Sequence, residues 1–252
     1  MHQHTDQPGQ NTVAAALAAH AAPTLSETEH RQVARGLTVS LVGLAGTLLL
    51  FGAAMLAFPG GHERMADGYS FSRHFLSAMG VTCVSNGTPN LPSCLMFNAA
   101  LALVGATFVF FWRARVLFVR NPAARRTLRL CGILMALGLA GIGLTPYDHL
   151  PHVHDRMNGL VIVCGGLGFV LCLLFTERRF ERWRSRLVWL TVVALAGSVD
   201  LAIRWMVHAG HLPERPALPM MQKVFVALLM AWVAWQCVLF RRTSRPFQHS
   251  RC

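Results

Sequence analysis

Apolar residues along this chain gather in six long runs separated by short polar segments. The runs cover 37–58, 95–112, 127–145, 158–176, 187–207 and 217–240. A helix of roughly 20 apolar residues spans the roughly 30 Å hydrocarbon core of a bilayer. Backbone groups in a bilayer are satisfied only within helices or closed barrels, and the ten-residue alternation of barrel strands is absent. We therefore predict an all-α fold with six transmembrane helices in one bundle.

Composition supports a polytopic membrane protein. Hydrophobic residues make up 54% of the chain and charged residues 13%, which is outside the usual balance of a soluble domain. We treat 36–240 as one transmembrane domain, 1–35 as a disordered cytoplasmic tail and 241–252 as a basic cytoplasmic tail. No signal peptide is predicted, because 1–35 lacks a cationic start followed by an apolar core and a cleavage site.

The net charge of +12 comes from arginines that precede the first run, fill the second and fourth connections and close the chain. The positive-inside rule makes these segments cytoplasmic, so both termini are expected in the cytoplasm and the protein in the plasma (inner) membrane. Such arginine blocks set topology and contact anionic lipids. We therefore predict membrane lipids as partners and no nucleic acid. The oligomeric state is not indicated.

Histidines concentrate on the predicted outer side. Seven of the 12 fall in the first, third and fifth connections or at their edges: His62, His74, His149, His152, His154, His208 and His211. Connections far apart in sequence thus meet at one end of a bundle, which is typical of a metal or acid/base site. The predicted metal is zinc, with ligands His74, His152, His154, His208 and His211. A metal-free proton or anion site is the alternative. Neither haem nor a nucleotide is expected.

The fifth run carries a polar stripe at helical spacing, formed by Asp200, Arg204, His208 and His211. An ionised side chain in the hydrocarbon costs a few kcal/mol unless it is paired or hydrated, so the stripe should face the bundle interior. Lys223, the only lysine, is a candidate counter-ion for Asp200 or for an anionic ligand. The alternative is an internal Asp200–Arg204 pair with Lys223 extending outward.

Together these residues suggest a reaction. Bound zinc lowers the pKa of water to about 7 and polarises a carbonyl oxygen. The candidate catalytic residues are Ser70, Asp148, Asp155 and Asp200, and the candidate head-group ligands are Arg156, Arg204 and Lys223. We predict a zinc-dependent hydrolase acting on a lipid amide or ester. The alternative is a non-enzymatic proton- or anion-coupled transporter or sensor that uses the same polar cavity.

The cysteines divide by the same topology. Cys83 and Cys94 flank the turn-rich segment "VSNGTPNLPS" in the first outer loop, where an oxidising compartment allows a disulfide. We predict that bond. The cysteines within spans are interpreted as small packing residues.

Four segments resemble a known family: "SRHFLSAMG", "MFNAALALVG", "GIGLTPYDHLPHVHDRMNGLVIV" and "MMQKVFVALLMAW". The chain resembles, over about 36–240, the six-span membrane proteins of domain of unknown function family 998. The resemblance implies a six-helix fold with a polar outer-facing cavity and implies no known reaction.

A more distant likeness is to alkaline ceramidases and adiponectin-receptor relatives, which combine Ser-x-x-x-His, an aspartate and H-x-x-x-H around zinc. Ser70 and His74 fit the first element. Those proteins have seven spans, and His208 and His211 are separated by two residues where the pattern requires three. The ligand assignments of that group are therefore not carried over.

Overall fold

The computed structural model describes residues 26–61, 68–177 and 181–243, and its six long apolar helices confirm the predicted all-α bundle. The long helices are α2 (Glu27–Ala57), α3 (Leu91–Arg115), α4 (Pro122–Leu144), α5 (Pro151–Phe175), α6 (Trp183–His208) and α7 (Glu214–Thr243). Two short 3-10 helices, η2 (Leu76–Gly80) and η3 (Val116–Phe118), lie in the connections. Each long helix is long and apolar enough to cross a membrane, so the protein is a multi-pass membrane protein.

Local chemistry fixes where α2 begins. The Ser26 hydroxyl accepts a hydrogen bond from the Glu29 backbone N–H, and the Glu29 carboxylate accepts one from the Ser26 backbone N–H, which is a capping box. The helix therefore starts at Glu27, and the predicted tail boundary at residue 35 falls inside α2. The rest of that predicted tail, 1–25, lies outside the described residues, as does 244–252 of the carboxyl-terminal tail.

Helix α5 starts earlier than the apolar run that predicts it. Proline is favoured in the first helical turn because it has no N–H to leave unsatisfied, and α5 begins at Pro151 in place of the predicted 158. Most of the histidine-rich connection is consequently the first turns of α5. Asp148 and His149 precede the helix.

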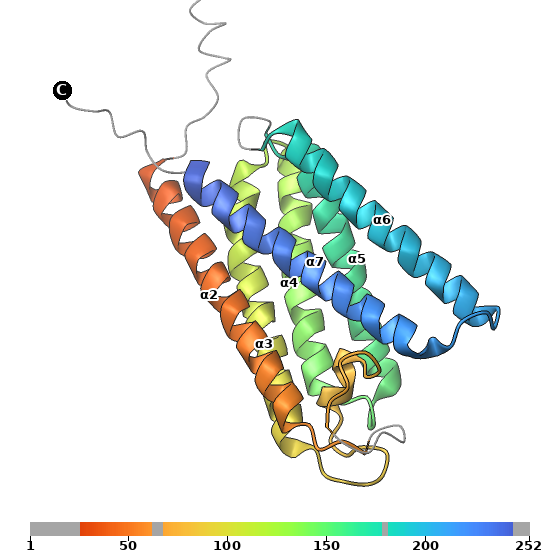
Figure 1. Cartoon of the computed structure of the whole chain (residues 1–252). Coiled ribbons are helices and arrows are strands. Elements are labelled where there is room, and N and C mark those ends of the chain that lie inside the picture. Colours follow the sequence, from red (N-terminus) through yellow and green to blue (C-terminus); the bar gives the residue numbers. More distant parts are fainter. Residues whose placement is uncertain (1–25, 62–67, 178–180, 244–252) are drawn as a thin grey trace, which may run out of the picture.

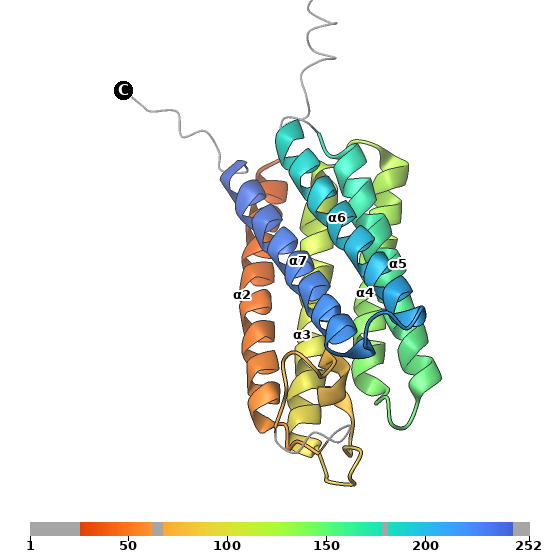
Figure 2. The ribbon, with the colours of Figure 1, turned by 45° about the vertical axis from the view of Figure 1, so that its right-hand side comes forward.

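Figures 1 and 2 show α2, α3, α4 and α5 as neighbouring antiparallel helices, and α7 crosses in front of them. Helix α6 lies beside α7, on the side away from α2. Aromatic side chains fill the space between α3 and α7. Trp232 of α7 packs edge-on against Phe111 of α3 and Phe169 of α5, with ring centroids 5.7 Å and 5.1 Å apart, and Phe240 lies 4.2 Å from Phe118. Large rings let α7 pack well without close backbone approach.

The two ends of the bundle differ in what they carry. The described residues of the connections 58–61, 68–90, 145–150 and 209–213 lie at one end, which the sequence predicts to face out and which we call the outer end. The described residues of the connections 116–121, 176–177 and 181–182 lie at the other end, the inner end, together with the start of α2 and the end of α7. Residues assigned to the predicted site all belong to the outer end or to the outer halves of helices.

Candidate functional site

His74 is fixed inside the α2–α3 connection. Its ring is fully buried and packs against Phe58 and Tyr69, with centroids 5.3 Å and 5.4 Å away. Its Nδ1 accepts a hydrogen bond of 2.9 Å from the backbone N–H of Ser70. The predicted proximity of Ser70 and His74 is therefore present, but as a turn that holds the loop: Ser70 reaches the ring through its backbone.

Lys223 of α7 supports the same loop. Its ammonium donates to the carbonyls of His74 at 2.5 Å and Pro219 at 3.2 Å, and it lies over the rings of Tyr69 and Phe71. Burying this cation is tolerable because carbonyl oxygens and aromatic faces replace water. Lys223 is buried and does not extend outward, and no hydrogen bond or ion pair links it to Asp200 in the part of the chain that the structure describes.

Asp148 ties the α4–α5 connection to the first loop. Its Oδ2 accepts hydrogen bonds from the Thr82 hydroxyl at 2.6 Å and from the backbone N–H groups of Thr82 and Cys83 at 2.9 Å and 3.2 Å. Desolvation by partial burial raises the pKa of Asp148, but these hydrogen bonds outweigh it and hold the pKa below its usual value. His149 joins the group through its Nε2, 2.8 Å from the Thr82 hydroxyl.

His154 is buried against the end of α4. Its Nδ1 lies 2.8 Å from the carbonyl oxygen of Thr145, and the Tyr147 ring meets it edge-on. A carbonyl at the C-terminus of a helix has no intrahelical partner, so the imidazole satisfies it. His152, Asp155 and Arg156 are exposed on α5.

The predicted stripe on α6 is present as an internal ion pair beside a pocket. Arg204 Nε donates to Asp200 Oδ2 at 2.8 Å, one helical turn away. An open pocket of about 510 Å³ adjoins this pair and is lined by Leu201, Arg204, Trp205, Val207, His208 and Leu218. His211 lies just beyond α6, with its ring 6.0 Å from that of Trp205.

The predicted gathering of histidines does not occur. Across residues 26–61, 68–177 and 181–243, no group of three or more His, Cys, Asp or Glu side chains is placed to hold a metal ion. The two buried imidazoles among the predicted zinc ligands, His74 and His154, are each engaged locally by the loop or helix end beside them, and His152, His208 and His211 are exposed. His62 lies outside the described residues. Zinc, and the catalytic roles of Ser70, Asp148, Asp155 and Asp200, stay predictions without a shared site.

The predicted disulfide is also absent from the structure. Cys83 and Cys94 are both free thiols, and they differ in environment. Cys83 is exposed in the loop, where its backbone N–H donates to Asp148, whereas Cys94 is buried at the start of α3 with its Sγ 3.4 Å from the Gly80 carbonyl. The loop is held closed by other bonds: Asn90 Nδ2 donates to the carbonyls of Met79 and Val81.

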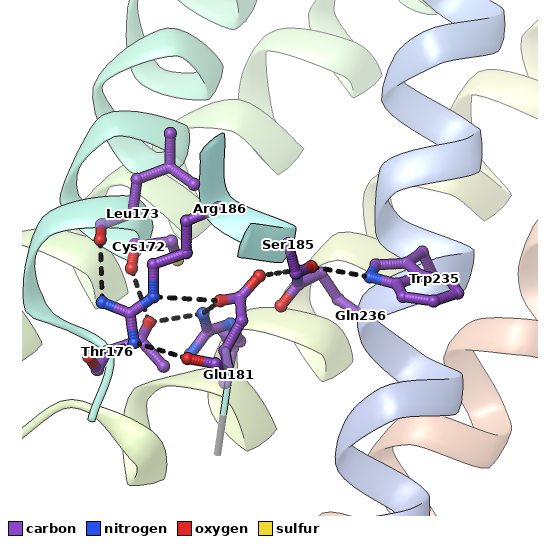
Figure 3. Close-up of polar contacts among 9 residues, drawn as sticks. Cys172, Leu173, Thr176, Glu181, Ser185, Arg186, Trp235 and Gln236 are labelled. Carbon is purple, nitrogen blue, oxygen red and sulfur yellow. Dashed lines mark hydrogen bonds and ion pairs between the residues drawn. The ribbon is translucent and has the colours of Figure 1, made fainter. Parts of the chain in front are cut away.

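A buried polar cluster lies at the inner end. We call Arg115, Thr176, Glu181, Arg186 and Gln236 the inner cluster (Figure 3). Glu181 Oε1 accepts a hydrogen bond of 3.0 Å from Gln236 Nε2, and Oε2 lies 3.5 Å from Arg115 Nη2 and 3.9 Å from Arg186 Nε. One carboxylate thereby joins α3, α6 and α7.

Backbone carbonyls complete the inner cluster. Arg186 donates to the carbonyls of Leu173 at 3.1 Å, Thr176 at 2.6 Å and Glu181 at 3.3 Å. Arg115 donates to the Thr176 hydroxyl at 2.5 Å and lies over the Phe240 ring, 4.4 Å from its centroid. A buried ion pair is tolerated only with such additional hydrogen bonds.

Sequence reasoning missed the inner cluster. The arginines of the second and fourth connections all have the same explanation under the positive-inside rule, which hides the two that are buried. The available signals were an acidic residue inside the arginine-rich segment "TERRFERWRSR" and a glutamine, Gln236, inside an apolar run.

The family model described as "Protein of unknown function (DUF998)" matches residues 62–239, most of the helical bundle. The chain belongs to this family, as the motifs around His74, Asp148 and Lys223 predict. No curated protein and no solved structure matches it.

Proposed function

We propose that the protein is a non-enzymatic membrane sensor in which α6 moves against the other five helices. The observation that carries the proposal is the burial of α6. Of its 26 residues, Arg186 alone is buried, and it lies in the first turn at the inner end. A helix that lipid surrounds on most sides along its length loses little protein packing when it tilts.

The contrast with α2 and α3 gives this observation its meaning. A methyl group added to Gly43 of α2 meets the Thr107 hydroxyl of α3 at 2.0 Å, and one added to Gly36 meets the Ala114 side chain at 3.1 Å. Small residues at such contacts allow close helix packing in membranes. A methyl group added to Gly197 of α6 meets nothing within 4 Å. The α2–α3 pair is therefore expected to move as one body, and α6 is not.

The inner cluster supplies a fixed point for such motion. Arg186 is bound to the end of α5 through two backbone carbonyls, and Ser185 accepts a hydrogen bond from Trp235 Nε1 of α7. These contacts lie within the first turn of α6, so the opposite end of the helix is the part with freedom to move.

The sensor fits the geometry better than the other two functions predicted from the sequence. A zinc hydrolase needs ligands that converge, and among the described residues no group of three or more His, Cys, Asp or Glu side chains is placed to hold a metal ion. A proton or anion pathway through Asp200, Arg204, His208 and Lys223 needs a continuous polar route, and Lys223 is bonded to carbonyls of the first loop and of its own helix. A pivoting helix requires neither.

Distance measurements between spin labels test the proposal. One pair of labels, at Ala202 of α6 and Leu144 of α4, measures the distance between the outer part of α6 and the other helices. A second pair, at Leu56 of α2 and Leu144, measures a distance within those other helices. All three positions are exposed. Cys83 and Cys252 are replaced by serine and the protein is placed in lipid nanodiscs. We expect a broad distance distribution for the first pair and a narrow one for the second.

A variant that weakens the fixed point sharpens the test. Glu181→Gln should broaden the Ala202–Leu144 distribution further and leave the Leu56–Leu144 distribution unchanged. Equally narrow distributions for both pairs in the unmodified sequence, or equal broadening of both in the variant, would overturn the sensor proposal. The first outcome is decided without the variant, so a failure of Glu181→Gln to fold does not remove the test.

A further inference from the structure

We propose that the ligand sensed by α6 is a phospholipid with an anionic head group, bound in the pocket between α6 and the start of α7. This inference rests on the proposed sensor function and names its ligand. The residues that line the pocket belong to the end of α6 and the start of α7. Figure 1 shows that these two helices approach their connection at the outer end of the bundle.

The lining of the pocket matches an amphiphile. Leu201, Trp205, Val207 and Leu218 give the pocket a largely apolar wall, and Arg204 and His208 give it a polar one. An acyl chain would lie on the first group and a phosphate on the second. Except for Leu218 of α7, these residues belong to the last turns of the membrane-spanning helix α6, the depth at which lipid head groups and chains meet.

Arg204 retains the donors that a phosphate needs. Its hydrogen bond to Asp200 uses Nε, and among the described residues neither Nη atom has a partner. Its side chain is 60% exposed while that of Asp200 is 17% exposed, so Asp200 is the more buried member and holds the guanidinium in place. A planar guanidinium with two free amino groups binds phosphate oxygens in a bidentate way.

The position of the pocket favours a lipid over a soluble anion. Leu201 and Trp205 are 70% and 65% exposed on a helix that spans the membrane, so they face acyl chains. A soluble anion would need only the nitrogen donors and gains nothing from this apolar surface. Tryptophan at such a depth is also typical of lipid contact near the head groups.

Trp205 provides the measurement. The protein is reconstituted in phosphatidylcholine bilayers that contain equal fractions of either brominated phosphatidylglycerol or brominated phosphatidylcholine, whose bromines quench tryptophan fluorescence on contact. The contribution of Trp205 is the difference between the unmodified protein and Trp205→Phe. We expect brominated phosphatidylglycerol to associate about fivefold more strongly, the ratio that a contact of about 1 kcal/mol gives.

Matched arginine variants locate the effect. Arg204→Gln should reduce the preference to one, and the double variant Asp200→Asn with Arg204→Gln should do the same without leaving an unpaired aspartate. Arg73→Gln removes the same charge from an exposed position in the first outer loop that does not line the pocket, and it should keep the preference.

Three results would overturn the lipid proposal. They are equal quenching by the two lipids in the unmodified protein, a preference that survives in both Arg204 variants, and loss of the preference when inorganic phosphate is added, which would assign the site to a free anion. None of these alters the spin-label distances. Failure of the ligand and failure of the moving helix are therefore separate outcomes.

Discussion

The inner and outer ends of the bundle use polar residues in opposite ways. At the inner end, side chains from α3, α6 and α7 and from the α5–α6 connection meet around one buried carboxylate, Glu181. At the outer end, His74, Asp148 and His154 each engage a nearby loop or helix end. A large number of polar residues at one end of a bundle therefore does not by itself indicate a shared site. Convergence depends on what each side chain has already satisfied locally.

The largest expected effect comes from breaking the inner cluster. Glu181→Gln removes the buried carboxylate that faces Arg115 and Arg186 and should lower the free energy of unfolding by about 3–5 kcal/mol. The unfolding midpoint in detergent, followed by intrinsic fluorescence, measures the loss. Glu27→Gln is the control, because the Glu27–Arg31 pair is exposed and such pairs contribute under about 1 kcal/mol. Equal losses in the two variants would show that burial of the inner cluster does not matter.

The next effect tests how the first outer loop is held. Asn90 is fully buried, and Asn90→Ala leaves the carbonyls of Met79 and Val81 without their donor. Each buried group left unsatisfied costs about 1–3 kcal/mol, so we expect a total loss in that range or slightly above it. Hydrogen exchange of 76–84 should accelerate together with the drop in the unfolding midpoint. Asn86→Ala, at an exposed turn, should change neither.

Asp148 at the outer end makes the stability of the protein depend on pH. Its pKa is lower in the folded protein than in the unfolded chain, so its hydrogen bonds add stability above the unfolded value of about 4 and this stability is lost as the pH falls below it. Asp148→Asn should reduce stability at neutral pH by about 1 kcal/mol and flatten the acid limb. Unfolding midpoints between pH 3 and pH 7 measure both effects. An acid limb that is the same in the two proteins would mean that other carboxylates produce it.

The sequence was sufficient to predict the six helices, but it was not sufficient to predict which polar side chains contact one another. Apolar runs of about 20 residues impose a spanning helix whatever the tertiary contacts, so all six helices were predictable. The ends of the helices depend on local signals outside the apolar runs, such as the capping residue Ser26 before α2 and Pro151 at the start of α5. The motif segments also identified the family correctly, because their order along the chain can be recognised without knowing which residues are in contact.

Topology places residues at an end of the bundle but says nothing about the direction of their side chains, so it could not show which candidate residues meet. Asp200 and Arg204 were expected as a pair in one alternative, which the i, i+4 spacing alone supports and the structure confirms. His74 and Lys223 were each placed at the correct end, yet the backbone of the first loop takes up both. Predicting the inner cluster would require knowing which two of the many arginines are buried, and only the packing of the helices determines that.

The smallest expected effect concerns the histidines that were predicted as zinc ligands. His152 is exposed on α5, so His152→Ala should change the free energy of unfolding by less than about 0.5 kcal/mol. His154→Ala, in contrast, removes the partner of the Thr145 carbonyl and should cost about 1 kcal/mol or more. Zinc content of the purified protein, measured by mass spectrometry of the element, supplies the independent check. If the outer end consists of separate local contacts, zinc stays well below one ion per chain and a chelator leaves the unfolding midpoint unchanged. One zinc per chain that disappears in His74→Ala and in His208→Ala would mean that the outer end rearranges to bring these side chains together, and the contrast between the two ends would be wrong.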